Sequence, residues 1–288
     1  MSQIPSTKEL IEKYNIRNKK SLGQNFILDK NFTDKIAKSA FDLSMNPILE
    51  IGAGPGGLTR SLLDAGAKNL FVIEKDEGCL EILKEIKNYH DNLTIIAGDA
   101  TKIDELEIFK NFINDNKKIK IVANLPYNIG TVLIFKWLKI INHIDSMYLM
   151  LQKEVVDKIV ACNESPNYGR LSLMINIWCD CRMLFKVNRS VFSPPPKVES
   201  AVVEIIPNLQ KIKLYSDQKI FTNYEFIIKT AFNQRRKMLK TSLKPYFNSM
   251  KFDEKNVEDF FMSCDVKSSM RPEELDYKKF WELAKFQK

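Results

Sequence analysis

Residues 48–63 read ILEIGAGPGGLTRSLL. The apolar run at the start of this stretch is typical of a buried strand, and its last third begins a helical pattern. The glycines between them let the chain turn tightly and let a ligand lie against the peptide without interference from a Cβ atom. The stretch therefore predicts a cofactor-binding turn. The spacing of Gly52, Gly54 and Gly57 fits a nicotinamide dinucleotide and S-adenosylmethionine equally well.

Similar short apolar runs recur along the chain and alternate with segments that can form helices. They cover residues 47–51, 70–74, 93–97, 120–124 and 147–151. This alternation predicts a doubly wound, mostly parallel sheet. Two further runs, 183–187 and 201–206, are separated only by a proline-containing loop, so they predict an antiparallel hairpin at one edge of the sheet. We expect a Rossmann-like α/β fold with seven strands.

The alternation stops after Pro207, and the rest of the chain has helical patterns at 224–243, 257–262 and 277–285. A periodicity near 3.6 residues without intervening strands is typical of a small helical domain. We therefore predict a catalytic, cofactor-binding domain over residues 1–207 and a helical C-terminal domain over residues 208–288.

The overall composition is that of a folded protein with a basic surface. The 288 residues include 44 Lys and Arg against 36 Asp and Glu, a formal net charge of +8, which suits a polyanionic partner. The five cysteines are odd in number and form no C-x-x-C pair, and there are two histidines, so we expect reduced thiols and no metal site. A polar N-terminus and the lack of a long uncharged apolar run predict a cytoplasmic protein without a membrane segment.

Two acidic residues follow the next strands of the predicted sheet. Glu74 ends the second strand, where a carboxylate can accept hydrogen bonds from the ribose hydroxyls of a cofactor. Asp99 follows the third strand, where an adenine amino group would need an acceptor. The alternative is that both residues only cap helices.

The segment that indicates the chemistry follows the fourth strand and reads NLPYNI at residues 124–129. The amino nitrogen of adenine is a poor nucleophile because its lone pair is delocalised into the ring. Two acceptors on its hydrogens would correct this: the side-chain oxygen of Asn124 and a main-chain carbonyl at Leu125 or Pro126. Pro126 stiffens the turn, and Tyr127 offers a face on which an extruded base can stack. The alternative is a chance proline–tyrosine turn.

A second aromatic candidate lies in the proline-rich loop between the last two strands. Phe192 precedes Pro194–Pro196, which predict a rigid, extended loop. Phe192 could enclose the base opposite Tyr127, or it could simply pack beneath the loop.

The predicted helix over residues 224–243 is strongly basic on one face. Residues 226–244 contain no acidic residue, while Phe232, Leu239 and Leu243 form an apolar stripe. RNA phosphates would be a natural partner for the cations, and a solvated charged helix is the alternative. The candidate RNA-binding residues are Lys229, Arg235, Arg236, Lys237 and Lys240.

Together these segments resemble the ribosomal RNA adenine dimethyltransferase family, in particular its small-subunit enzymes, over nearly the whole chain. The matching motifs are SLGQNF at 21–26, EIGAGPG at 50–56, EKD at 74–76, GDA at 98–100, NLPYNI at 124–129 and AFNQRRK at 231–237. Two positions depart from the family pattern. Gly130 stands where serine is more common, and Ile27 and Leu28 replace the commoner Leu-Asn pair.

The resemblance implies S-adenosylmethionine as the cofactor. It implies contacts to this cofactor from Asn25, Ile27, Gly52, Glu74, Asp99 and Asn124. Phe26 would belong to a lid over the cofactor, and Tyr127 and Phe192 to the base pocket. The implied substrate is two adjacent adenosines in a hairpin loop near the 3′ end of small-subunit ribosomal RNA, each dimethylated at N6.

The same resemblance implies a role in small-subunit biogenesis. We expect a cytoplasmic monomer that acts on small-subunit RNA in a pre-30S particle, with the C-terminal domain contacting RNA. Three other functions compete with this interpretation. They are a large-subunit adenine methyltransferase with the same Asn-Leu-Pro-Tyr core, an RNA-binding assembly factor with a vestigial cofactor site, and a nicotinamide-dependent dehydrogenase.

Overall fold

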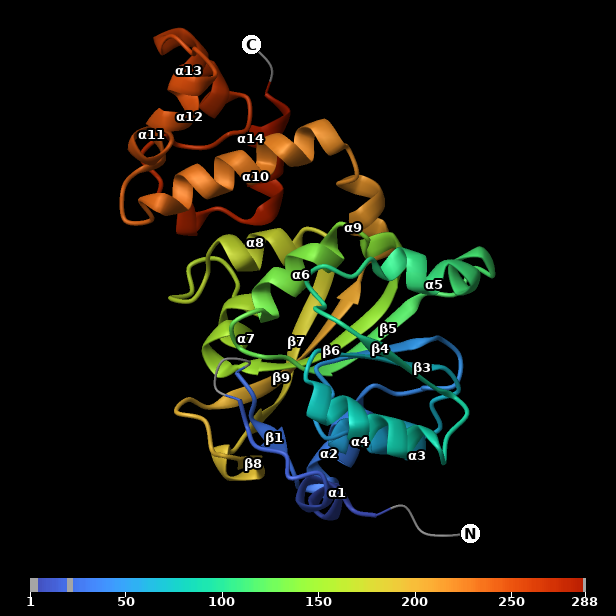
Figure 1. Cartoon of the computed structure of the whole chain (residues 1–288). Helices are drawn as coiled ribbons and strands as arrows, with labels where there is room; N and C mark the ends of the chain where they lie inside the picture. Colours follow the sequence, from blue (N-terminus) through green and yellow to red (C-terminus); the bar gives the residue numbers. More distant parts are fainter. Residues whose placement is uncertain (1–4, 20–22, 287–288) are drawn as a thin grey trace. The chain divides into compact units, whose positions relative to one another are not determined.

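The structure, a computed structural model, describes residues 5–19 and 23–286 and divides them into two compact units (Figure 1). The first unit contains the residues up to Val156 together with Arg182–Pro207. The second contains Asp157–Cys181 together with the residues from Asn208 onward. Asp157–Cys181 lies inside the stretch predicted as the first domain. Its place in the second unit depends on contacts distant in sequence, such as the ring of Trp178 stacked on that of Phe221 at 4.3 Å between centroids.

A seven-stranded sheet forms the centre of the first unit, in the order β4-β3-β2-β5-β6-β9-β7. The strands are β2 (Ile48–Ile51), β3 (Leu70–Glu74), β4 (Leu93–Ala97), β5 (Ile119–Asn124), β6 (Ile144–Gln152), β7 (Cys179–Val187) and β9 (Ser200–Pro207). The first five pair in parallel, and β9 runs antiparallel to β6. The predicted mostly parallel α/β fold is confirmed.

Helices connect these strands and cover both faces of the sheet. They are α1 (Thr7–Lys13), α2 (Lys30–Ser39), α3 (Gly57–Asp64), α4 (Glu77–Lys87), α5 (Glu105–Asn114), α6 (Gly130–Leu138) and α7 (Lys153–Ile159). In Figure 1, α3 and α4 lie on one face of the sheet and α5 and α6 on the other. Strand β2 is therefore buried on both faces, which explains its uninterrupted apolar pattern apart from Glu50.

A second, two-stranded sheet joins the N-terminal segment to the proline-rich loop. Strand β1 (Phe26–Ile27) pairs antiparallel with β8 (Phe192–Ser193), and Ile27 lies opposite Phe192. The loop after β7 was predicted to be extended but not to pair. This pairing brings two motifs that are far apart in sequence to the same place.

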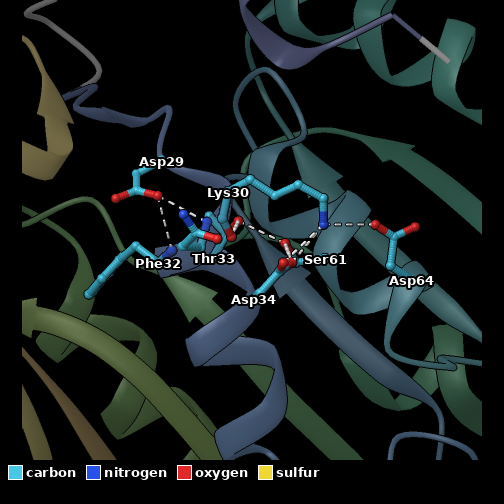
Figure 2. A network of polar contacts seen from close by, with 8 residues as sticks. Asp29, Lys30, Phe32, Thr33, Asp34, Ser61 and Asp64 are labelled. Carbon is cyan, nitrogen blue, oxygen red and sulfur yellow. Dashed lines mark hydrogen bonds and ion pairs between the residues drawn. The ribbon is translucent and has the colours of Figure 1, made fainter.

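Polar contacts between α2 and α3 hold β1 in position (Figure 2). The hydroxyls of Thr33 and Ser61 lie 2.7 Å apart, and the Ser61 hydroxyl donates to Asp34 at 2.6 Å. Lys30 joins the group through ion pairs with Asp34 and Asp64, at 2.9 and 3.0 Å. Since β1 comes just before α2, fixing α2 against α3 also fixes β1 beside the glycine loop that precedes α3.

The second unit is helical. It contains α8 (Arg170–Asn176), α9 (Leu209–Leu214), α10 (Gln218–Asn233), α11 (Leu239–Ser242), α12 (Lys244–Ser249), α13 (Glu254–Met262) and α14 (Tyr277–Lys285). Its core is rich in aromatic rings, and the largest fully buried side chains include Trp281, Tyr224, Tyr246 and Phe260. The hydroxyl of Tyr224 donates to the carbonyl of Leu173 at 2.9 Å, which joins α10 to α8.

The continuous helix predicted over residues 224–243 is wrong, because α10 ends at Asn233 and a turn precedes α11. Contacts with distant segments hold the turn. The guanidinium of Arg235 donates to the carbonyls of Ser165 and Pro166, and the amide of Leu239 donates to the carbonyl of Met270 at 2.7 Å. A local periodicity contains no information about these partners.

None of the described helices is long and apolar enough to cross a bilayer. The longest, α10, has 16 residues, whereas a spanning helix needs about 20 apolar ones.

We expect the Ser61→Ala substitution to lower the free energy of unfolding by about 1–3 kcal/mol, because it leaves buried Thr33 and partly buried Asp34 without a shared partner. Ser39→Ala is the matched control, since the Ser39 hydroxyl donates to the carbonyl of Ile36 within the same helix. Its effect should stay within about 0.5 kcal/mol. Urea unfolding of both variants measures this, and equal losses would show that the α2–α3 contacts contribute nothing specific.

Candidate active site

A cavity of about 270 Å³ lies where β2, β3 and β5 end. Its lining includes the glycine loop from Gly52 to Gly57, Glu74 and Asp99, and the segment from Asn124 to Ile129. Phe26, Ile27 and Phe192 complete its wall. The segments that follow β2 and β5, which the sequence predicts to act together, therefore line the same pocket.

The glycine loop is closely approached by other parts of the pocket. A Cβ atom at Gly52 would lie 3.5 Å from the Pro126 ring, and one at Gly54 would lie 3.1 Å from the Phe26 ring. Both glycines have positive φ angles, +66° and +56°. A side chain at either position would therefore be strained, and one at Gly54 would also crowd the Phe26 ring.

Glu74 is held by main-chain amides. Its Oε2 accepts from the Gly54 amide, and its Oε1 accepts from the amides of Lys75 and Asp76, all at 2.8 Å. A carboxylate has about four acceptor positions, so one remains for a ligand hydroxyl in this arrangement. Asp76, and not Glu74, is the N-cap of α4.

Asp99 carries a firmly held negative charge in the pocket lining, just after β4, the strand that pairs with β3. Its Oδ1 accepts from the hydroxyl of Thr101 at 2.7 Å, and its Oδ2 pairs with Lys75 at 3.0 Å. These two contacts lower the pKa of Asp99 well below its usual range. Asp99 therefore remains an acceptor at any physiological pH.

The loop that follows Asp99 is anchored by a buried ion pair that the sequence analysis did not identify. The ammonium of Lys136, on α6, donates to the carbonyls of Ala100 and Ile103 and pairs with Glu105 at 2.8 Å. Glu105 also accepts from the indole of Trp137 at 2.9 Å. No pattern in the sequence singled out Lys136 and Glu105, because their role is to hold a loop whose position is set by the tertiary structure.

Glu50 is a second residue that the sequence analysis did not assign to the site. It lines the pocket from within β2, is 1% exposed, and accepts a hydrogen bond from the Thr59 hydroxyl at 2.7 Å. Burial raises the pKa of Glu50 from an ordinary 4.5 to about 8. The carboxyl beneath the glycine loop is therefore neutral at pH 7.

Asn124 is oriented by the N-terminal segment. Its Nδ2 donates to the main-chain carbonyl of Asn25 at 3.4 Å. An amide nitrogen donates and an amide oxygen accepts, so this contact assigns the nitrogen to Asn25. Among the described residues no group donates to Oδ1, which is left as an acceptor. Asn25 and Asn124, which the sequence predicts to serve one cofactor, are therefore in contact.

The two candidate main-chain acceptors differ in what they already bind. The Pro126 carbonyl accepts from the amides of Ile129 and Gly130, both at 3.2 Å, at the start of α6. In the part of the chain that the structure describes, no group donates to the Leu125 carbonyl. Of the two alternatives, Leu125 is the available acceptor.

Gly130 accounts for one departure from the family pattern. A Cβ atom there would lie 2.6 Å from the Leu151 Cδ2. Serine at this position would require the Leu151 side chain to move. Glycine leaves the space that Leu151, on β6, occupies in this chain.

Tyr127 and Phe192 both line the pocket. Tyr127 is partly buried, burial raises the pKa of its phenol, and its hydroxyl lies 2.6 Å from that of Ser200. Phe192 is only 4% exposed. Its ring therefore both packs beneath the loop and forms part of the pocket wall.

The N-terminal segment closes one side of the pocket through Asp76. The Gln24 amide and the Lys19 ammonium each contact Asp76 Oδ2 at 2.9 Å. Burial opposes the charge on Asp76, but these contacts lower its pKa overall. The motif residues Ser21 and Leu22 lie outside the described residues.

The predicted RNA-binding residues belong to the second unit and differ in exposure. Lys229, Arg236, Lys237 and Lys240 are exposed, whereas Arg235 pairs with Glu273 and is 33% exposed. Arg236, Lys237 and Arg271 line one hollow beside the turn after α10. The sequence analysis missed Arg271, because only the fold of this unit brings it to the turn.

Comparison with known proteins agrees with this geometry. A family model described as ribosomal RNA adenine dimethylase matches residues 15–286. The ribosomal RNA small subunit methyltransferase A of Paramagnetospirillum magneticum is 40% identical over 99% of this chain and 95% of its own length. That of Ruegeria pomeroyi is 40% identical over 98% and 96%.

Solved structures show the same relationship. A dimethyladenosine transferase from Plasmodium falciparum is 28% identical, with a TM-score of 0.73 over 88% of this chain and 94% of that one. The 23S rRNA methyltransferase ErmE shares the fold at 23% identity, with a TM-score of 0.65 over 90% and 98%.

We expect the Glu50→Gln substitution to flatten the pH dependence of stability. In the unfolded chain Glu50 ionises above about pH 4.5, but in the folded protein it stays protonated up to about pH 8. The wild type therefore loses stability across this window as pH rises, by an amount on the order of a few kcal/mol. Glutamine cannot titrate and should remove that loss.

Urea unfolding at pH 5 and pH 8 measures the difference between the two proteins. The control is Glu107→Gln, an exposed position on α5, which should keep the wild-type dependence. A Glu50→Gln protein that lost stability as steeply as the wild type would show that Glu50 ionises like an exposed carboxyl.

Proposed function

The chain belongs to the ribosomal RNA adenine dimethylase family, and on this premise we propose which residues carry out its reaction and which RNA it modifies. It is an enzyme that dimethylates adenine in ribosomal RNA with S-adenosylmethionine as the methyl donor. A nicotinamide-dependent dehydrogenase is thereby excluded. The observation that carries the proposed site is the shared pocket of the glycine loop and the segment from Asn124 to Tyr127.

The pocket residues fit S-adenosylmethionine. The glycine loop lines the cavity with main chain that carries no Cβ atoms at Gly52, Gly54 and Gly57, and Glu74 retains an acceptor position for a ribose hydroxyl. Asp99 is a permanent acceptor for the adenine amino group, although Lys75 must share it. We assign Gly52, Asn25, Ile27 and Asn124 to the remaining cofactor contacts. The cofactor supplies an activated methyl group on a sulfonium.

The enzyme has to make the exocyclic amino group of the target adenine nucleophilic. Asn124 Oδ1 and the Leu125 carbonyl, to which no described residue donates, are the proposed acceptors, one for each amino hydrogen. Accepting both hydrogens draws the nitrogen lone pair out of conjugation with the ring. Pro126 restricts the turn that holds them, and its own carbonyl anchors α6. Most of the acceleration then comes from proximity and orientation, so no general base is required.

Tyr127 and Phe192 form the base pocket in this proposal. An adenine that leaves its stack loses stacking energy, and an aromatic face can return about 1–3 kcal/mol per base. Both rings line the cavity that also contains Asn124. The intact acceptors argue against an assembly factor with a vestigial cofactor site.

The proposed substrate is small-subunit ribosomal RNA in a pre-30S particle. The named small-subunit relatives, at 40% identity over nearly their whole length, support this branch over the large-subunit one. We propose dimethylation at N6 of two adjacent adenosines in a hairpin loop near the 3′ end, by a cytoplasmic monomer with a role in small-subunit biogenesis.

The second unit is the proposed RNA-contacting part of the enzyme. Its exposed cations Lys229, Arg236, Lys237 and Lys240 suit phosphate contacts. Arg271 joins Arg236 and Lys237 at one hollow. Arg235 has a different role. Its guanidinium is occupied by Glu273 and by the carbonyls of Ser165 and Pro166, so it shapes the turn that presents its neighbours.

We expect Asn124→Ala to abolish methylation while RNA binding stays close to wild type, because only one acceptor would remain. The assay incubates unmodified small subunits with enzyme and S-adenosylmethionine and maps modified adenosines by mass spectrometry. Isolated large subunits are the control substrate and should take up no methyl groups. Unchanged turnover in the variant would falsify the mechanism, and methylation of large subunits alone would reject the proposed substrate.

We expect Arg236→Ala and Lys237→Ala each to reduce the slope of log binding constant against log salt by roughly 0.7–0.9, the value for one phosphate contact. Arg235→Ala should instead lower the melting temperature. Binding of small-subunit RNA across a salt series and thermal unfolding separate the two effects. Lys110→Ala, an exposed position in the first unit, is the control. Equal salt slopes in all four variants would contradict the division of roles.

A further inference from the structure

The phenol of Tyr127 contacts a residue that belongs to no recognised motif of the pocket. Its hydroxyl lies 2.6 Å from the hydroxyl of Ser200, the first residue of β9. Ser200 is fully buried and does not line the cavity, whereas Tyr127 does. The tip of the pocket tyrosine is therefore tied to the sheet behind the pocket.

Ser200 is a rigid anchor. It pairs with Gln152 on β6, and the carbonyl of the preceding Glu199 accepts from the amide of Lys153 at 2.9 Å. Tyr127, in contrast, lies in the turn between β5 and α6, where no strand pairing holds it. Within residues 5–19 and 23–286, Ser200 is the hydrogen-bond partner of the Tyr127 hydroxyl.

Rotation of the Tyr127 side chain about Cα–Cβ would carry the hydroxyl away from Ser200. The hydrogen bond at the tip therefore fixes the direction in which the ring points from the turn. Burial also raises the pKa of Tyr127, which keeps the phenol neutral. A neutral phenol and a neutral hydroxyl can hold this contact whichever of them donates.

We propose that Ser200 is a positioning residue for methyl transfer, because its hydroxyl holds the Tyr127 ring in the orientation in which the target adenine stacks. This inference rests on the proposed function, in which Tyr127 forms a wall of the base pocket. Ser200 touches neither cofactor nor base, and its effect passes entirely through Tyr127.

The test compares wild type, Ser200→Ala, Tyr127→Phe and the double variant on small subunits. Each single variant removes one end of the same hydrogen bond and keeps a ring at position 127. We expect each to lower kcat about tenfold, with the KM for S-adenosylmethionine unchanged, because the reacting adenine is held less often in line. The double variant should also lose about tenfold, since the second change removes nothing further.

Two controls separate positioning from a loss of folding. Ser146→Ala removes another buried hydroxyl, at the opposite end of β6, and should keep the wild-type kcat. Tyr127→Phe changes only the pocket side of the contact, so it reports even if Ser200→Ala does not fold. Thermal unfolding of every variant accompanies the kinetics.

The outcomes distinguish this inference from the proposed function. A double variant that loses about a hundredfold would show independent effects and overturn the inference. Wild-type kcat in both single variants together with an inactive Tyr127→Ala enzyme would also overturn the inference. The proposed role of Tyr127 in the base pocket would then still stand. A Tyr127→Ala enzyme with wild-type turnover would reject the proposed role of Tyr127 in the base pocket, and the positioning role of Ser200 would be rejected with it.

Discussion

Parallel pairing of β2 with β5 is the constraint on which the site depends. Ile48 lies opposite Lys120 and Leu49 opposite Ile121, although the two strands are separated in the chain by two complete strand–helix units. Because the strands are parallel, their carboxyl ends meet at the same edge of the sheet, and the loops after them face each other. The glycine loop and the segment from Asn124 to Tyr127 become neighbours for this reason alone, and the Pro126 ring then lies against Gly52.

The neighbouring parts of the pocket are held by buried and partly buried polar contacts in addition to apolar packing. Glu74 gathers three main-chain amides, Asp76 ties Gln24 and Lys19 to the start of α4, and Lys136 secures the loop after Asp99. Each of these charges is paired or hydrogen-bonded, as burial requires. Their common effect is to preorganise acceptors before any ligand arrives, and catalysis of methyl transfer depends on such positioning.

The second unit shows a similar division between residues that build a surface and residues that present charge. Arg235 belongs to the same basic run as Arg236 and Lys237, but its guanidinium is directed to carbonyls and to Glu273. An arginine with five donors in a fixed fork is well suited to hold a turn in this way. Arg235 holds the turn through these contacts, and the turn sets the arrangement of the exposed cations beside it.

The sequence by itself determined the fold class, the glycine loop and the Asn-Leu-Pro-Tyr turn to which the proposed site is assigned. These depend on short-range signals, namely alternating apolar runs, glycine spacing and one tetrapeptide, and such signals are complete within a few neighbouring residues. It also placed Arg235 on a helix that in fact ends at Asn233. The tertiary structure alone decided that Leu125 rather than Pro126 has the free carbonyl, that Glu50 is neutral, and that Ser200 holds Tyr127. Each of these depends on which distant residue fills an acceptor or excludes water, and a linear pattern does not contain that information.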